Sequence, residues 1–202
     1  MSDAAYNSPL AHRSDREGVD GLSISMREVS DRGMIDLRGE AGSAKFKQAV
    51  KSVIGIDLPL QPRTSTAKSS FTVLWLSVDH WLILCPKAEA PAITAKLTAA
   101  LGSLHSLAVD VSDARAIIRL EGDNTREVLM KGSSIDFTMP EYKAGHVRRM
   151  IFAEIAALAH VVSDKPCMVD LFVFRSYADY TWKWLVATSN PGAKIGLFSV
   201  SK

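Results

Sequence analysis

The sequence has little of what marks a disulfide-bonded, redox or metal protein. Among its 202 residues there are only two cysteines, Cys85 and Cys167, and neither has a second cysteine nearby. Neither a disulfide framework nor a zinc knuckle can be built from them. Both are therefore expected to be buried, reduced thiols. The five histidines show no i, i+4 pair that could present two metal ligands on one helix face.

The sequence also lacks a strong charge of either sign and a long apolar run. With 24 basic and 22 acidic side chains its net charge is +2, far from the basic excess that binding to nucleic acid usually needs. The longest apolar candidate, residues 151–162, is too short for a membrane span and carries Glu154 and His160. The first twenty residues contain several charges and no apolar core, unlike a secretory signal peptide. We therefore expect a cytoplasmic protein with neither nucleic acid nor membrane as a partner.

Local catalytic motifs are absent from the sequence as well. It contains no G-x-G-x-x-G loop, Walker lysine, G-x-S-x-G elbow, H-E-x-x-H or C-x-x-C. Asp110 and Asp113 flank Ser112 and could act as a paired acid and base. A turn in which these side chains bond to backbone amides is the better interpretation, because a Ser-Asp pair recurs at Ser30-Asp31.

What the sequence does contain is a duplication. Val29-Ser30-Asp31 precedes an apolar run that ends at Gly39, and Val111-Ser112-Asp113 precedes one that ends at Gly122. Each copy continues with a helical pattern, a pair of apolar strands and a second helix. The order ββαββα, found twice, predicts an α+β fold with sheets covered by helices. Residues 1–20 would form an extended N-terminal arm, and residues 21–202 a single duplicated domain with halves at about 21–104 and 105–190.

Residue patterns locate several of the elements. An apolar stripe at i, i+4, i+7 and i+8 from Phe46 predicts a helix that Gly55 ends in the left-handed conformation. In the second copy, Asn124 is expected to cap a helix whose third residue is Glu127, with Gly132 following its end. The expected strands at 71–77 and 80–85, and the expected hairpin strands 147–162 and 167–174, are apolar. Along the first pair both faces are apolar, so we expect burial on both sides.

The last helix, expected between Ser176 and Ala187, has an unusually wide apolar face. It carries two stripes that lie about 125° apart at 100° per residue. Both stripes could be internal core, or one of them could meet a partner. The first stripe consists of Tyr177, Tyr180 and Trp184, and the second of Ala178, Trp182 and Leu185.

Short motifs are spread over nearly the whole chain, about residues 8–188, and their order and spacing are more specific than any one of them. In chain order they are Ser8-Pro9-Leu10-Ala11, Leu37-Arg38-Gly39, Gly55-Ile56-Asp57-Leu58-Pro59, Trp75-Leu76 with Asp79-His80-Trp81-Leu82, Val109-Asp110-Val111-Ser112, Leu120 with Gly122, Lys131-Gly132 with Asp136, and Arg175-Ser176-Tyr177-Ala178 with Trp182. Together they resemble the gamma subunit of heterotetrameric sarcosine oxidase.

This resemblance implies a fold, a function and a set of partners. The family looks like a reduced relative of the folate-binding domain of aminomethyltransferases, the glycine cleavage T-proteins. It implies a non-catalytic subunit that supports the alpha subunit in oxidative demethylation of sarcosine to glycine and hydrogen peroxide and, with tetrahydrofolate, 5,10-methylenetetrahydrofolate. It further implies that the alpha, beta and delta subunits hold FAD, FMN, NAD, zinc and tetrahydrofolate, and that this chain binds no cofactor or metal and has no catalytic residue.

The resemblance and the apolar stripes together suggest where a partner binds. We expect a partner interface, chiefly with alpha, at Ser8, Pro9, Leu10, Tyr177 and Trp182. The polar segment Ser2–Gly18 is expected to be ordered only against a partner, because it has too few apolar residues to dock on its own core.

An alternative is a stand-alone, folate-dependent aminomethyltransferase-like protein. For this alternative 202 residues are short, and no acid/base pair is evident. Ser133 also stands where relatives often have cysteine in the loop after Lys-Gly, which disfavours it.

Overall fold

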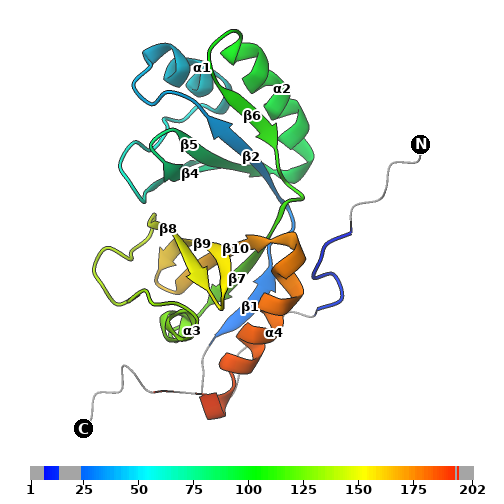
Figure 1. Ribbon diagram of the computed structural model, residues 1–202, viewed down its shortest axis with the longest axis vertical. Helices are drawn as coiled ribbons and strands as arrows, with labels where there is room; N and C mark the ends of the chain where they lie inside the picture. The colour runs from blue at the N-terminus through cyan, green and yellow to red at the C-terminus, as the bar shows by residue number, and fades with distance from the viewer. Residues whose placement is uncertain (1–6, 14–23, 194, 196–202) are drawn as a thin grey trace. The chain divides into compact units, whose positions relative to one another are not determined.

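The computed structural model describes residues 7–13, 24–193 and 195, and the chain divides into two compact units (Figure 1). Unit 1 comprises residues 1–30, 115–144 and 150–202, and unit 2 comprises residues 31–114 and 145–149. Among the described helices, none has both the length and the apolar character needed to cross a membrane.

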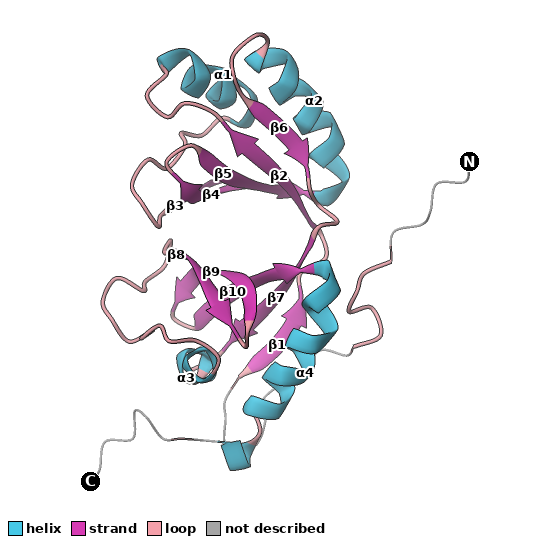
Figure 2. Ribbon diagram, in the orientation of Figure 1, coloured by secondary structure: helices cyan, strands magenta, loops and turns pink. Residues whose placement is uncertain are grey.

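Unit 2 is an antiparallel sheet with two helices on one face (Figure 2). Its elements are β2 (Arg32–Arg38), α1 (Ala44–Ile54), β3 (Ser65–Lys68), β4 (Phe71–Ser77), β5 (His80–Pro86), the 3-10 turn η1 (Lys87–Glu89), α2 (Ala90–Leu101) and β6 (Leu107–Asp110). The strand order is β3-β4-β5-β2-β6. Along β4 and β5, side chains on both faces of the sheet are buried, as predicted.

Unit 1 repeats this plan with a second antiparallel sheet, which α3 and α4 cover on one face. Its elements are β1 (Ser25–Glu28), β7 (Arg115–Glu121), α3 (Thr125–Lys131), β8 (Val147–Phe152), which begins in unit 2, β9 (Ile155–Asp164), β10 (Cys167–Phe174), the 3-10 turn η2 (Arg175–Tyr177), α4 (Ala178–Thr188) and the 3-10 turn η3 (Pro191–Ala193). The strand order is β1-β7-β10-β9-β8.

The strand orders of the two sheets show the duplication. The order β6-β2-β5-β4-β3 becomes β1-β7-β10-β9-β8 when each strand is replaced by its counterpart in the other repeat. Among the described residues, each repeat has one strand more than predicted. In the first repeat β3 was missed. In the second, the chain turns at Ala153 and Glu154, both with positive φ, so the run 147–162 forms two strands. The first strand of each repeat is the edge strand of the other repeat's sheet, since β1 pairs with β7 and β6 with β2.

The repeated Val-Ser-Asp motif has the same role in both repeats. In each repeat the motif follows the first strand. The N–H of its valine donates to a backbone carbonyl in the second strand of the other repeat, which is the strand that pairs with that first strand. Val29 donates to the carbonyl of Ile117 at 2.9 Å, and Val111 donates to that of Met34 at 2.8 Å. The repeated Val-Ser-Asp motif therefore marks the point at which the chain passes from one sheet to the other.

Helix α1 forms as its sequence predicts. The side chain of Ser43 accepts the N–H of Phe46, which satisfies a free amide of the first turn. Gly55 ends the helix at φ 73°, in the left-handed region that only glycine enters without strain, and its N–H bonds to the carbonyl of Lys51. The stripe that packs on the sheet consists of Phe46, Val50 and Ile54, with Val53 partly buried.

Helix α3 has the predicted bounds, with Glu127 as its third residue and Gly132 after its end, but it lacks the predicted cap bond. Asn124 makes no side-chain cap bond, because its backbone (φ −95°, ψ 7°) is not in the extended conformation of a typical N-cap. Gly132 follows the helix at φ −103°, so it is not needed for a left-handed turn. A Cβ at Gly132 would lie 2.7 Å from the ring of Phe152 and 2.8 Å from that of Trp184, which pack edge to face 4.9 Å apart. This glycine is therefore required by packing.

Each unit has a hydrophobic core between its helices and its sheet. In unit 2 the fully buried Trp81 packs on Phe46 and donates its indole N–H to the carbonyl of Pro59 at 2.8 Å. Both cysteines are buried, as predicted. Burial raises the pKa of the Cys85 thiol to about 11, which keeps it protonated and unreactive.

Candidate partner-binding surface

The N-terminal segment, residues 7–13, binds to its own unit. Leu10 is only 2% exposed and belongs to the core of unit 1. Ser8 accepts the N–H of Leu10 at 3.1 Å and donates to the carboxylate of Glu28 near the end of β1. The expectation that the segment has too few apolar residues to dock on its own core is therefore wrong for residues 7–13, because one leucine provides the anchor. Residues 2–6 and 14–18 of the predicted segment lie outside the described residues.

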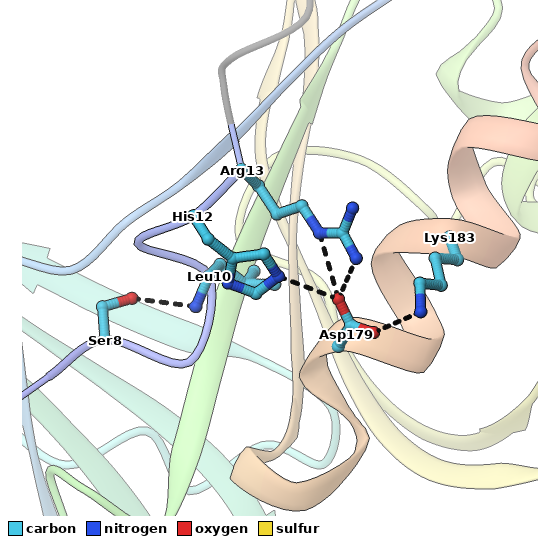
Figure 3. A network of polar contacts seen from close by, with 6 residues as sticks. All are labelled: Ser8, Leu10, His12, Arg13, Asp179 and Lys183. Atoms are coloured by element: carbon cyan, nitrogen blue, oxygen red, sulfur yellow. Dashed lines mark hydrogen bonds and ion pairs between the residues drawn. The ribbon is translucent and has the colours of Figure 1, made fainter.

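A cluster of charges joins this segment to the first turn of α4 (Figure 3). One oxygen of Asp179 accepts hydrogen bonds from the guanidinium of Arg13 and lies 3.2 Å from the imidazole of His12, and the other accepts from Lys183 at 2.8 Å. The bonds from Lys183 and Arg13 hold the pKa of Asp179 well below its usual range. The contact of Arg13 with α4 is thus ionic, and solvent reaches it, so salt weakens it.

Several aromatic side chains close to Asp179 in the sequence are exposed. Tyr177, in η2, is 46% exposed, and Phe174 and Tyr180 are exposed to a similar degree. The guanidinium of Arg115 lies 4.5 Å from the ring centre of Phe174, a cation–π contact. Arg175 donates to the carbonyl of Asn7, which links the segment to η2. We use the name aromatic–basic surface for Ser8, Pro9, Arg13, Phe174, Arg175 and Tyr177.

The structure shows how much of each stripe of the last helix is buried. The stripe Ala178, Trp182 and Leu185 is buried in the core of unit 1, and Trp182 is 4% exposed. The other stripe is divided: Trp184 packs on Phe152, and Tyr180 donates its hydroxyl to the carbonyl of Ala153 at 2.9 Å, while the ring of Tyr180 stays exposed. The wide apolar face thus serves the core with one stripe and leaves part of the other uncovered.

The five residues predicted for a partner interface therefore differ in what they can contact. Leu10 and Trp182 are covered by their own unit. Ser8 and Pro9 are half-buried in the docked segment, and Tyr177 is exposed. Sequence reasoning missed the role of Asp179. Its i, i+4 spacing to Lys183 is visible in the sequence, but its contacts with Arg13 and His12 join positions 166 and 167 residues apart.

Asp110 and Asp113 do not form an acid/base pair. Asp110 accepts the N–H of Ser112 at 2.9 Å, Ser112 accepts the N–H of Met34 at 3.0 Å, and Asp113 pairs with Lys87 at 2.9 Å. These contacts fix the turn that follows β6, so the structural interpretation of the motif is confirmed.

Unit 2 has an open pocket of about 480 Å³ where β2 and β6 stop pairing. Its lining carries both signs of charge, from Arg38, Glu40 and Asp79, and also includes His105. Close to Arg38, His80 pairs with Asp36; burial lowers the pKa of this histidine, and the carboxylate opposes that effect. Within residues 7–13, 24–193 and 195, no three or more His, Cys, Asp or Glu side chains are grouped so that they could hold a metal ion.

Comparison with known proteins places this architecture in a class. The glycine cleavage system aminomethyltransferase T from Bartonella henselae superposes with a TM-score of 0.61 over 81% of this chain and 45% of that protein, at 13% identity. The chain thus shares its duplicated α+β fold with part of aminomethyltransferase T, as predicted. Residues 38–191 match the sarcosine oxidase, gamma subunit family, and the chain belongs to this family.

Individual relatives agree with that assignment. Sarcosine oxidase subunit gamma of Arthrobacter sp is 26% identical over 188 residues, which cover 92% of this chain and 90% of the relative. The same subunit of Corynebacterium sp. (strain P-1) is 25% identical over equal shares. A chain in the structure of heterotetrameric sarcosine oxidase from Corynebacterium sp. U-96, in complex with pyrrole 2-carboxylate, has a TM-score of 0.84 at 24% identity, over 97% of this chain and 99% of that one. The resemblance found from short motifs is therefore confirmed.

Proposed function

We propose that this chain is the gamma subunit of a heterotetrameric sarcosine oxidase and has no catalytic residue of its own. The observation that carries the proposal is membership of the gamma-subunit family across residues 38–191, together with likeness to gamma subunits over 92% of the chain. The assembly oxidises sarcosine with oxygen to glycine and hydrogen peroxide. When tetrahydrofolate is present it passes the one-carbon unit on as 5,10-methylenetetrahydrofolate.

In this proposal the cofactors belong to other chains. FAD, FMN, NAD, zinc and tetrahydrofolate are held by the alpha, beta and delta subunits, and this chain binds none of them. The likeness to heterotetrameric sarcosine oxidase supports such a division of tasks. We place the assembly in the cytoplasm, since two buried and unpaired cysteines suit a reducing compartment.

We further propose that the aromatic–basic surface meets the alpha subunit. Tyr177 offers a large exposed ring, and aromatic and arginine side chains are those that dominate protein interfaces. The docked segment presents Ser8 and Pro9 on the same unit, fixed by Leu10 and by the contact between Arg175 and Asn7. The surface is therefore organised before a partner arrives, which lowers the entropic cost of binding.

Co-expression of this chain with the alpha, beta and delta subunits from the same source tests the assembly. We expect the four chains to copurify as one complex that oxidises sarcosine. Tyr177→Ala should weaken the binding of this chain by about 2 kcal/mol or more, the cost typical of an aromatic hot spot. Leu60→Ala, which truncates a similarly exposed apolar side chain in unit 2, is the matched control. A chain that stays monomeric among its partners contradicts the proposal, and unchanged binding of Tyr177→Ala contradicts the choice of surface.

The stand-alone folate-dependent aminomethyltransferase-like protein remains the second candidate. Its support is the likeness of the fold to aminomethyltransferase T and the pocket beside Arg38, whose volume lies in the range of small-molecule sites. Titration of the isolated chain with tetrahydrofolate tests it, with Arg38→Ala as the comparison. Saturable binding with turnover, lost in the variant, favours the enzyme, and a chain without turnover favours the subunit.

A further inference from the structure

Helix α3 carries two charged side chains that are almost completely buried. The side chain of Glu127 is 2% exposed and that of Lys131 is 7% exposed. They stand one helical turn apart, with the ammonium 3.8 Å from the carboxylate. Charged side chains with so little exposure are rare unless they are paired and hydrogen-bonded. Lys131-Gly132 is one of the short motifs of the sequence, and the subunit role proposed above does not use the Glu127–Lys131 pair.

Both charged groups bond to the main chain at the end of the last helix and just after it. The ammonium of Lys131 donates to the carbonyl of Thr188, the last residue of α4, at 2.8 Å and to that of Ala193, in η3, at 2.5 Å. The carboxylate of Glu127 accepts the N–H of Ile195 at 2.9 Å. The pair therefore binds the chain at three points between residues 188 and 195, and every bond is made to the main chain.

The chemistry of these bonds explains why charges are used here. Carbonyl groups at the end of a helix carry partial negative charge and have no partner within the helix, so an ammonium satisfies them well. An apolar pair of the same size would pack in this space, but it could neither donate to these carbonyls nor accept the N–H of Ile195. Burial lowers the pKa of Lys131, and the nearby carboxylate of Glu127 opposes that effect, so Glu127 helps the lysine to keep its charge.

We propose that Glu127 and Lys131 form a latch that fastens residues 188–193 and Ile195 onto α3. Opening the latch releases this segment while the sheet and the remainder of α4 stay folded. Its two members differ in role: Lys131 holds the end of α4 and η3, and Glu127 holds the amide of Ile195 and neutralises the lysine. The latch depends on contacts within unit 1 and not on the identity of any partner.

Hydrogen–deuterium exchange of the full chain, resolved by residue, tests the latch. Lys131→Met removes the charge and the donors but keeps most of the volume. We expect the amide of Ile195 to exchange faster by roughly tenfold or more, since hydrogen bonds to charged groups are lost, while amides within β10 keep their protection. Lys183→Met is the matched control, because it removes a lysine of α4 that is 66% exposed and pairs with Asp179, outside the latch. It should leave the exchange of Ile195 unchanged.

Glu127→Gln provides the second variant. Its amide oxygen can still accept the N–H of Ile195, but the lysine loses its counter-charge, so we expect a smaller acceleration confined to residues 188–193 and Ile195. If Lys131→Met does not fold, the exchange of Ile195 in Glu127→Gln decides the question: faster exchange supports the latch and unchanged exchange overturns it. Equal acceleration in residues 188–193 and Ile195 and in β10 also overturns the proposal, because the pair would then act only as a general stabiliser of unit 1.

Discussion

Replacing Leu10 by alanine separates the two roles that this residue could have. The change removes three carbon atoms from a side chain that is nearly completely buried in the core of unit 1. At about 0.8 kcal/mol for each buried carbon, the loss of transfer free energy is about 2.4 kcal/mol. A buried leucine in a rigid core costs up to about 5 kcal/mol, because a cavity is left behind. Residues 7–13 can detach instead of leaving a cavity, so we expect a loss close to the lower figure.

Urea denaturation of the full chain gives the change in the free energy of unfolding, and trypsin gives the state of the segment. We expect Leu10→Ala to unfold at lower urea and to be cut after Arg13 faster than the parent, since the segment has lost its anchor. Ala11→Ser, at the exposed neighbouring position, is the control and should change neither result. A variant with the parent's stability and cleavage rate, but weaker binding to partner subunits, would refute the reasoning and show Leu10 to be a partner contact.

Three further predictions test the packing and the electrostatics of unit 1. Trp182→Ala should lower the free energy of unfolding by about 3–5 kcal/mol, whereas Tyr177→Ala should change it by less than about 0.5 kcal/mol; equal losses in urea denaturation would contradict the assignment of the two stripes. Gly132→Ala should cost about 1–3 kcal/mol from crowding against two rings, and an unchanged melting temperature would contradict that packing. Burial lowers the pKa of His160 to about 4, so below about pH 6.5 the unfolded chain takes up a proton more readily and stability falls, by roughly 3 kcal/mol in total at pH 4. His160→Gln should lack this part of the pH dependence, and parallel stability–pH curves for the two proteins would contradict it.

The features that the sequence predicted well depend on contacts within a few residues. Helix α1 is an example, because its stripe and its end at Gly55 are set by neighbours along the chain. The duplication was visible because both repeats keep the same order of elements and the same Val-Ser-Asp turn. The family resemblance depended on many short motifs and was confirmed over most of the chain.

The features that the sequence could not predict depend on distant contacts. The start of α3 looked like a capped helix, but its Glu127 is directed to the amide of Ile195, which is 68 residues away. The docking of residues 7–13 on α4 joins the two ends of the chain in a similar way. The local residue pattern also did not indicate which of the two sheets β1 and β6 would join. A short strand with one apolar face can pair with the edge of either sheet.

The exchange of β1 and β6 affects how the chain can fold as it is synthesised. Unit 2 is nearly continuous in sequence, from residue 31 to residue 114, whereas β1 belongs to a sheet whose next strand starts at Arg115. On the ribosome, β1 emerges before β7, so it has no strand to pair with until residues 31–114 have also been synthesised. Unit 2 can close during that interval, and unit 1 can close only after β7 has left the exit tunnel. A gene cut between the repeats, near residue 105, would separate β6 from the sheet it completes, so a fragment of unit 2 should extend to residue 114.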